Sequence, residues 1–240
     1  MPKRKAEVKL EPKAVARRKM EDAPHRPETI AVIVGAPEQE QIFNVHTDLL
    51  IKHSNFFRAA LSNDWKESRS RRVELRDVEP EHFEVFKDFL YTGFVYCSKA
   101  GDSTDPPHPR LACCWVLGER VLCTAFKDAA SDAFLDKYAF HNKTPLRAQF
   151  DIYPNSTERS CIRRLLVDFA AHTWHVDFFR REELAEDNAA FIVDVAIRLV
   201  EIRNRSEGKK NLQWIVDRCE YHEHVSEKKP CYLETFRKAR

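Results

Sequence analysis

The chain has 240 residues, of which 43% are hydrophobic and 32% are charged, and its net charge is +2. This composition supports one domain-sized core with a second helical unit, and it excludes a globally disordered chain. Only five glycines occur, which favours helices over a β-sandwich or barrel. No stretch approaches the roughly 18 uninterrupted apolar residues of a membrane helix, so we expect a soluble chain without a membrane partner.

The first 27 residues carry nine basic and four acidic side chains, a net charge of +5 that leaves the rest of the chain mildly acidic. We expect 1–27 to be a disordered basic tail, because it has little apolar surface to bury. Two basic clusters separated by eleven residues resemble a bipartite nuclear import signal. They consist of Lys3, Arg4, Lys5, Arg17, Arg18 and Lys19. The alternative is a solvated tail without that role.

The charged N-terminus is unlike a secretory signal, and seven cysteines are scattered along the chain. Both observations indicate a reducing compartment, which we take to be the nucleus and also the cytoplasm. Lys9 lies in the sequence VKLE, which resembles the consensus of the SUMO-conjugating enzyme and makes Lys9 a candidate acceptor; a chance match is the alternative. Nucleic-acid binding is not expected, because no aromatic residue lies among the basic ones to stack on bases.

The folded region is predicted to begin near Thr29. A β-branched run at 30–34 is followed by glycine and a polar turn, and 41–45 returns as a second strand, so the pattern predicts a hairpin. Ser54 has the residue type of a helix N-cap and precedes a segment with apolar residues on one helical face. Alternation of apolar and charged residues at 73–75 predicts a third strand.

Another helix is predicted after Asp77, with Pro80 in its first turn and acidic side chains near the positive end of its dipole. Thr92 and Gly93 end this helix. Its apolar face comprises Phe83, Val85, Phe86, Phe89 and Leu90.

The second half of the chain is predicted to be helical. Residues 97–110 are polar with paired prolines and predict a mobile loop. Apolar stripes that follow predict two buried helices that reach about residue 140. Proline and polar residues at 141–156 predict a linker, and further apolar stripes predict a C-terminal helical extension at 157–240, with about three helices stacked on the first domain.

The order of the signals between residues 43 and 93 resembles the BTB/POZ domain, in particular that of the small BTB proteins of filamentous fungi. The segment reads FNVHTDLL at 43–50, SNFFRAAL at 54–61 and FLYTG at 89–93. The resemblance implies an α+β fold over residues 28–140, in which a small mixed sheet is flanked by a cluster of helices. An all-helical C-terminal extension would follow this domain.

The resemblance also implies protein binding as the function. BTB domains form homodimers, in which the same patch of each protomer packs across a two-fold axis. The matching positions here, unless some fill the protomer's own core, are Leu49, Leu50, Phe56, Phe57, Ala60 and Leu61. The second expected partner is a cullin-type ubiquitin ligase scaffold. Its predicted surface comprises Asp77, Val78, Glu79, Glu81 and Phe83.

Two thiols and two imidazoles occur close together near the end of the sequence. They belong to Cys219, His222, His224 and Cys231. This is the ligand set of a closed tetrahedral zinc site, although the spacing matches no standard zinc module. A polar helix end with a capping tail is the alternative. Apart from this candidate zinc site, no cofactor is expected.

The sequence does not predict an enzyme. Cys113 and Cys114 lie in an apolar helical run, and the chain has neither a glycine-rich phosphate loop nor the usual surroundings of a nucleophile. Two non-enzymatic functions remain. In the first, the chain is a substrate adaptor that binds a cullin-type ligase and an unknown protein client. In the second, it is a nuclear scaffold or transcriptional regulator that self-associates.

Overall fold

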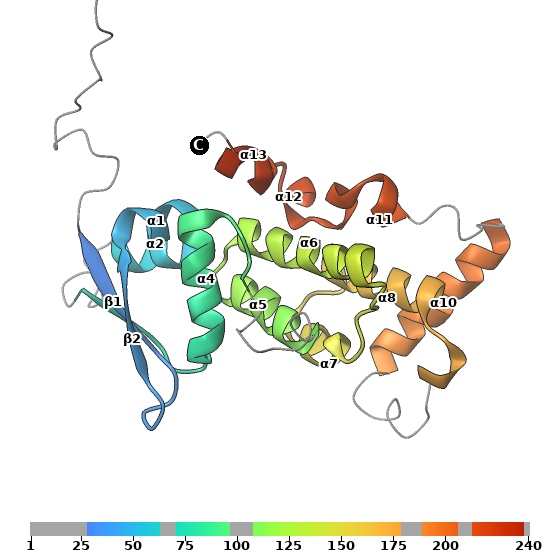
Figure 1. Cartoon of the computed structure of the whole chain (residues 1–240), viewed down its shortest axis with the longest axis horizontal. Coiled ribbons are helices and arrows are strands. Elements are labelled where there is room, and N and C mark those ends of the chain that lie inside the picture. Colours follow the sequence, from blue (N-terminus) through green and yellow to red (C-terminus); the bar gives the residue numbers. More distant parts are fainter. Residues whose placement is uncertain (1–27, 63–70, 97–107, 179–188, 206–212, 238–240) are drawn as a thin grey trace, which may run out of the picture.

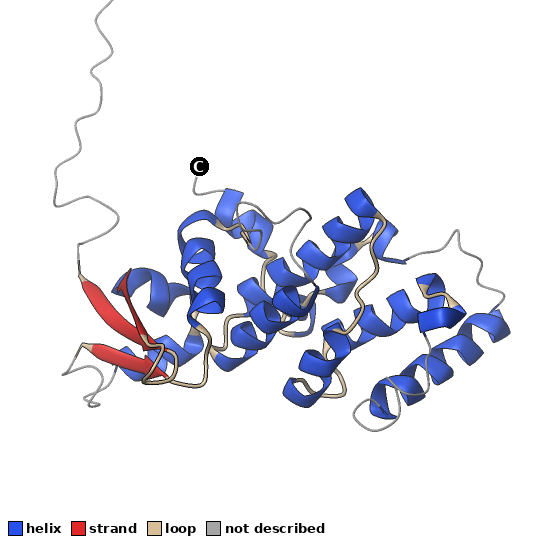
Figure 2. Cartoon of the chain, turned by 60° about the horizontal axis from the view of Figure 1, so that its bottom comes forward, coloured by secondary structure: helices blue, strands red, loops and turns tan. Residues whose placement is uncertain are grey.

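The computed structural model describes residues 28–62, 71–96, 108–178, 189–205 and 213–237 (Figure 1). A three-stranded sheet lies at one end of an otherwise helical molecule, as Figure 2 shows. Within the described residues, no helix has both the length and the apolar character to cross a membrane.

The sheet has β1 (Thr29–Val34) at its centre. β2 (Gln41–His46) pairs with β1 in antiparallel orientation, and β3 (Arg72–Leu75) pairs with its other edge in parallel orientation. Val32 and Val34 of β1 are fully buried and face the helices, because alternate side chains of a strand point to the same face. The predicted hairpin and third strand are confirmed.

Two short helices follow the hairpin, α1 (Thr47–His53) and α2 (Asn55–Ser62). Ser54 Oγ accepts a hydrogen bond from the Phe57 backbone N–H at 3.1 Å and donates one to the Val121 carbonyl at 2.5 Å. The predicted N-cap residue Ser54 therefore also connects α2 to the turn at Val121, which is distant in the sequence.

Helix α4 (Pro80–Thr92) supplies the centre of the core. It begins with proline in its first turn and ends at Gly93, whose φ of +77° is left-handed, as predicted for a glycine C-cap. Phe86 and Phe89 of α4 are fully buried, and both rings contact Phe126 of the next helical pair, with centroid distances of 5.1 and 5.2 Å. These three rings join the first helices to the rest of the molecule.

Helices α5 (His108–Arg120) and α6 (Thr124–His141) form the predicted helical hairpin. They cross closely at Gly118, where a Cβ atom would lie 2.7 Å from Cγ of Lys127. The mobile loop predicted at 97–110 needs correction at its end, because 108–110 form the first turn of α5; 97–107 lie outside the described residues. His108 is buried against Phe134, with stacked rings 5.9 Å apart, which explains the earlier helix start.

The segment predicted as a linker, 141–156, does not act as a spacer. It contains α7 (Ala148–Ile152) and the 3-10 helix η2 (Tyr153–Asn155), and both Ala148 and Ile152 are fully buried. Polar residues and prolines suggested a linker, yet the few apolar side chains between them are sufficient to pack α7 against α5 and against the next helix, α8 (Cys161–Thr173). The core therefore continues through this segment.

Two long helices form the far end of the molecule, α8 (Cys161–Thr173) and α10 (Ala189–Arg205), with the short η3 (Val176–Phe178) before the second. Asp168 of α8 is buried between them. Its carboxylate accepts a hydrogen bond from Arg198 Nε at 2.6 Å and another from the Tyr221 hydroxyl at 2.7 Å. This buried group connects α8, α10 and the C-terminal segment.

The chain then returns along the molecule towards the sheet, as the red helices in Figure 1 show. This C-terminal segment contains α11 (Gln213–Val216), η5 (Arg218–Tyr221), α12 (Glu223–Ser226) and α13 (Tyr232–Arg237). Glu223 Oε1 accepts hydrogen bonds from Ser160 Oγ and the Cys161 N–H, at 2.8 and 2.9 Å, and so caps α8.

The end of the C-terminal segment packs on the first helices. The ring of Phe236 lies 5.1 Å from that of Phe89 and 5.0 Å from that of His53, and a Cβ on Gly93 would lie 2.6 Å from Phe236. One core cluster thus extends from Ile30 to Tyr232. The helical extension, expected at the end of the first domain, also lies along its side.

Candidate functional site

The surface predicted to bind a partner lies where α4 begins. Asp77, Glu79 and Glu81 are exposed there, and Asp77 accepts a hydrogen bond from Arg120 Nε at 2.9 Å. This hydrogen bond lowers the pKa of the Asp77 carboxyl below its usual value. Asp77 and Glu79 also line a hollow of about 440 Å³ whose other wall is α5, including Val116. We call these three acidic residues and the hollow the acidic surface.

Two further residues were predicted for the same surface. Val78 is 9% exposed and lines the hollow, whereas Phe83 is fully buried in the core. The Phe83 ring packs on those of Phe43 and Phe86, at centroid distances of 5.0 and 5.7 Å. The helical period turns Phe83 inward and Glu81, two residues earlier, outward, while Glu79 precedes the helix as its extended N-cap residue.

The six residues of the predicted dimer patch lie partly in the core and partly at the surface. Leu50 and Phe57 are fully buried and Leu49 nearly so, and they fill the protomer's own core. Phe56, Ala60 and Leu61 of α2 are only partly buried, and these three residues form the α2 patch. Arg120 lies over the Phe56 ring at 5.4 Å while it pairs with Asp77. The α2 patch and the acidic surface are therefore adjacent.

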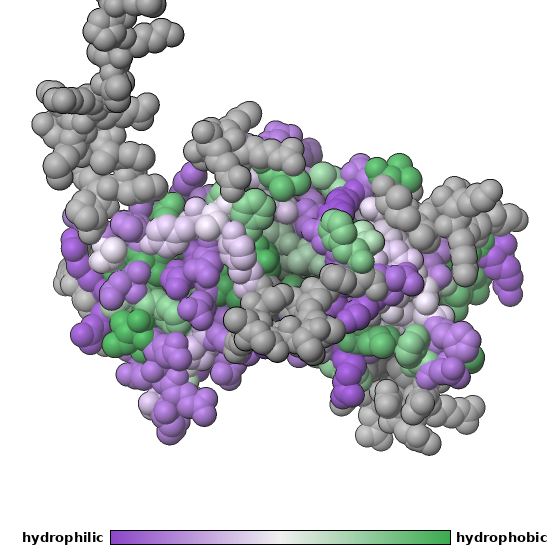
Figure 3. Space-filling view, in the orientation of Figure 1, coloured by the Kyte–Doolittle hydropathy of each residue, from purple (hydrophilic) through white to green (hydrophobic). Residues whose placement is uncertain are grey.

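Several exposed apolar side chains were not identified from the sequence. Tyr91, Phe94 and Tyr96 lie at the end of α4, with 47 to 56% of each side chain exposed. On α10, Val193, Ile197 and Val200 are exposed and fall at the spacing of one helical face. Figure 3 shows hydrophilic side chains around the sheet end, with smaller hydrophobic groups between them. The apolar stripe predicted on this helix consists of other residues, Ile192, Val195, Ala196, Leu199 and Ile202. Val195 is buried as expected, whereas Leu199 is 46% exposed.

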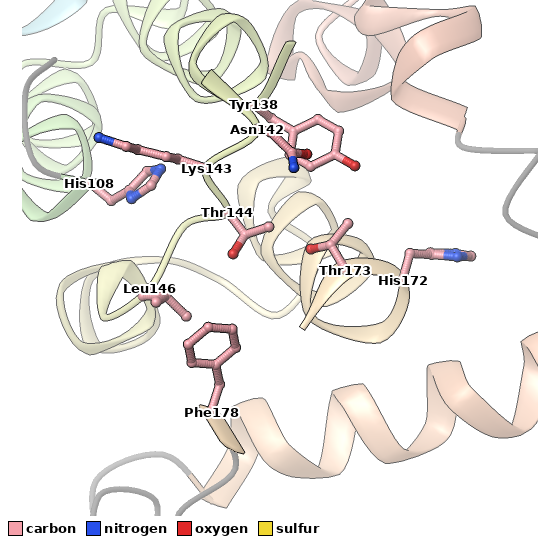
Figure 4. A pocket seen from close by; sticks show the side chains of 9 residues that line it. All are labelled: His108, Tyr138, Asn142, Lys143, Thr144, Leu146, His172, Thr173 and Phe178. Carbon is pink, nitrogen blue, oxygen red and sulfur yellow. The ribbon is translucent and has the colours of Figure 1, made fainter. Parts of the chain in front are cut away.

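A larger hollow of about 570 Å³ opens between α6, α8 and η3 (Figure 4). Its described lining has histidine, hydroxyl, amide, lysine and apolar side chains, and it includes neither a carboxylate nor a cysteine. Two histidines and a lysine in this lining could transfer protons, but no described residue of the lining offers a carboxylate to orient them or a thiol nucleophile. The lining residues are His108, Tyr138, Asn142, Lys143, Thr144, Leu146, His172, Thr173 and Phe178.

The structure brings together the four residues of the candidate zinc site. Cys219 lies in η5, His224 in α12 and Cys231 just before α13. His222 has extended backbone angles, φ −103° and ψ 138°, between η5 and α12, and this non-helical residue lets both histidines turn to the same side. One donor atom from each of the four residues lies within 4.8 Å of the others. We call this group the Cys/His cluster.

The basic clusters of the predicted import signal and Lys9 lie outside the described residues.

Comparison with known proteins agrees with the fold. Residues 28–105 match the family model described as BTB/POZ domain. The chain is 26% identical over 222 residues to the human proteins named Kelch repeat and BTB domain-containing protein 7 and protein 6. Each alignment covers 86% of this chain, and 31% and 32% of those proteins respectively. Mouse Kelch-like protein 30 is 38% identical over 71 residues, which are 30% of this chain and 12% of that protein.

The fold and these matches define a protein-interaction module. The chain contains a BTB/POZ domain with a small mixed sheet, followed by a helical extension. The alignments with the two human proteins extend well beyond the family match, so they include part of that extension. The chain spans about a third of the length of these relatives.

Proposed function

We propose that the chain is a BTB-mediated homodimer that serves as a substrate adaptor of a cullin-type ubiquitin ligase. The observation that carries the proposal is the acidic surface beside a hollow at the start of α4. It offers exposed carboxylates around a partly apolar depression, a combination that suits a protein partner. The family match and the relatives with BTB domains and kelch repeats support the same class of function.

The homodimer is proposed to form through the α2 patch. Phe56 and Leu61 are apolar and only partly buried, and such a patch can meet its own copy across a two-fold axis. Because Arg120 contacts Phe56 and pairs with Asp77, a dimer contact on α2 would border the acidic surface. Dimer formation and ligase binding would then use neighbouring sides of the same domain.

Charge reversal on the acidic surface tests the adaptor function. We expect the purified 240-residue chain to retain the cullin of its source organism in a pull-down. The double variant Glu79→Lys/Glu81→Lys should bind the cullin at least about tenfold more weakly. Placing like charges against a partner costs several kcal/mol, and each 1.4 kcal/mol corresponds to a factor of ten. Light scattering on the same samples should give twice the chain mass of 28.1 kDa in the absence of cullin.

The matched control is Glu201→Lys, which reverses an exposed charge on α10. This variant should bind the cullin as the unmodified chain does. If both variants lose cullin binding equally, the acidic surface is not the binding site. If the unmodified chain is a dimer that does not bind the cullin, the adaptor function is wrong. A monomer in light scattering would reject the homodimer.

A nuclear scaffold or transcriptional regulator is the second candidate, and the two basic clusters favour it. In this function, the tail would deliver a self-associating BTB protein of the small fungal type to the nucleus, where Lys9 would accept SUMO. The discriminating observation is the location of a fluorescent fusion in cells of the source organism. Replacement of Arg17, Arg18 and Lys19 by alanine should move the fusion to the cytoplasm, and unchanged localisation would reject the import signal.

A further inference from the structure

We propose that Cys219, His222, His224 and Cys231 bind one zinc ion, which fastens the C-terminal segment to helix α6. This inference goes beyond the proposed ligase function and does not depend on it. Two thiolates and two imidazoles form a closed structural site, with Zn–S distances of roughly 2.3 Å and Zn–N distances of roughly 2.0 to 2.1 Å. Donor atoms within 4.8 Å of one another need only small inward shifts to reach a tetrahedron of that size.

His222 already has the orientation of a zinc ligand. Its Nε2 atom is hydrogen-bonded to Asp132 Oδ1 at 3.0 Å, while Nδ1 is buried and has no hydrogen-bond partner among the residues that the structure describes. The residue is 1% exposed. A buried polar atom without a partner is unfavourable, and a zinc ion would provide the partner that Nδ1 lacks.

His224 repeats the arrangement with its nitrogens exchanged. Nδ1 is hydrogen-bonded to Asp128 Oδ2 at 2.7 Å, which leaves Nε2 for the ion. The rings of the two histidines are 5.2 Å apart. In zinc proteins, the ring nitrogen that does not bind the metal is commonly held by a carboxylate, which fixes the orientation of the ring. Each histidine of the Cys/His cluster has such a carboxylate.

The two carboxylates are themselves held in place. Asp128 and Asp132 lie four residues apart on α6 and therefore on one side of the helix. Asp128 Oδ1 accepts the Glu223 backbone N–H at 2.6 Å, and Asp132 Oδ2 accepts the Tyr232 hydroxyl at 2.7 Å. Each carboxylate thus holds a histidine ring with one oxygen and a second group of the C-terminal segment with the other.

The two thiols complete the ligand set. Cys219 and Cys231 are both partly buried, and each offers a sulfur atom within 4.8 Å of the other donor atoms. A coordinating zinc ion deprotonates its thiols and compensates their charge. A disulfide between Cys219 and Cys231 would use the same sulfurs, but it would leave His222 Nδ1 without a partner.

Metal content and thiol protection test the site in the 240-residue chain. Protein purified without chelator should contain one zinc ion per chain, and replacement by cobalt should give the visible absorption of tetrahedral Co²⁺ with thiolate ligands. Zinc should also protect Cys219 and Cys231 from alkylation until a chelator removes it, which mass spectrometry of the alkylated peptides can show. This last measurement requires no variant, so it holds even if a variant fails to fold.

Single substitutions distinguish the cysteines that bind zinc from the other cysteines of the chain. Cys219→Ser and Cys231→Ser should lose the zinc ion, whereas Cys113→Ser, a partly buried thiol outside the cluster, should keep it. Asp132→Asn should weaken zinc affinity by about ten- to a hundredfold, as expected for loss of a carboxylate that orients a ligand. Absence of zinc and of the cobalt spectrum in the unmodified chain would overturn the proposal. So would zinc retained equally by Cys219→Ser, or a Cys219–Cys231 disulfide in protein prepared under reducing conditions.

Discussion

Phe126→Ala is expected to lower the free energy of unfolding by about 3 to 5 kcal/mol, the usual cost of removing a fully buried phenylalanine. Phe126 is fully buried, and its ring contacts those of Phe86 and Phe89 at 5.1 and 5.2 Å. The substitution would remove this contact between α4 and α6 and leave a cavity where the aromatic rings meet. Urea unfolding followed by circular dichroism measures the loss.

The control for this prediction is Phe140→Ala, the same substitution on the same helix. Phe140 is 78% exposed, so its removal should change stability by no more than about 0.5 kcal/mol. If the two variants unfold at similar urea concentrations, the three-ring contact does not contribute as described. A change in the slope of the transition would indicate an altered unfolded state.

Asp168→Leu is expected to cost about 3 to 5 kcal/mol, the range for breaking a buried ion pair by removing one partner. Asp168 is 4% exposed, and its carboxylate receives hydrogen bonds from Arg198 at 2.6 Å and from the Tyr221 hydroxyl at 2.7 Å. The substitution removes the buried counter-charge of Arg198 and the acceptor of Tyr221. The same unfolding measurement applies.

Two further variants identify the cause of the stability loss expected in Asp168→Leu. Tyr221→Phe removes a single hydroxyl and should cost about 1 kcal/mol. Asp168→Leu/Arg198→Leu removes both charges and should recover much of the stability lost in Asp168→Leu, because an apolar pair avoids the cost of an uncompensated charge. A double variant as unstable as Asp168→Leu would show that packing, and not charge, explains the loss.

Local signals in the sequence predicted most of the elements in the first half of the chain. The hairpin, β3 and α4 were found from alternation, turn residues, Pro80 and Gly93, because each signal depends on a few neighbouring residues. The side to which a residue points was predicted less well. Phe83 was placed on the surface although it is fully buried.

Long-range packing was not predictable in the same way. The segment 141–156 has the composition of a linker, and only contacts with α5 and α8 turn α7 into part of the core. Likewise, the four residues of the Cys/His cluster were identified from their types, but Asp128 and Asp132 were not. These two residues are more than 85 positions away from the histidines that they hold, and no spacing rule connects them.

The return of the C-terminal segment has a consequence for the order in which the protein can fold during synthesis. The family match ends at residue 105, yet Phe89 and Gly93 are covered by Phe236, which follows Gly93 by 143 residues in the sequence. Domains generally fold as units with the N-terminal part first. Here the first domain is synthesised early but can complete its core only after the C-terminal segment with Phe236 has been synthesised, so until then its aromatic side chains stay available to chaperones.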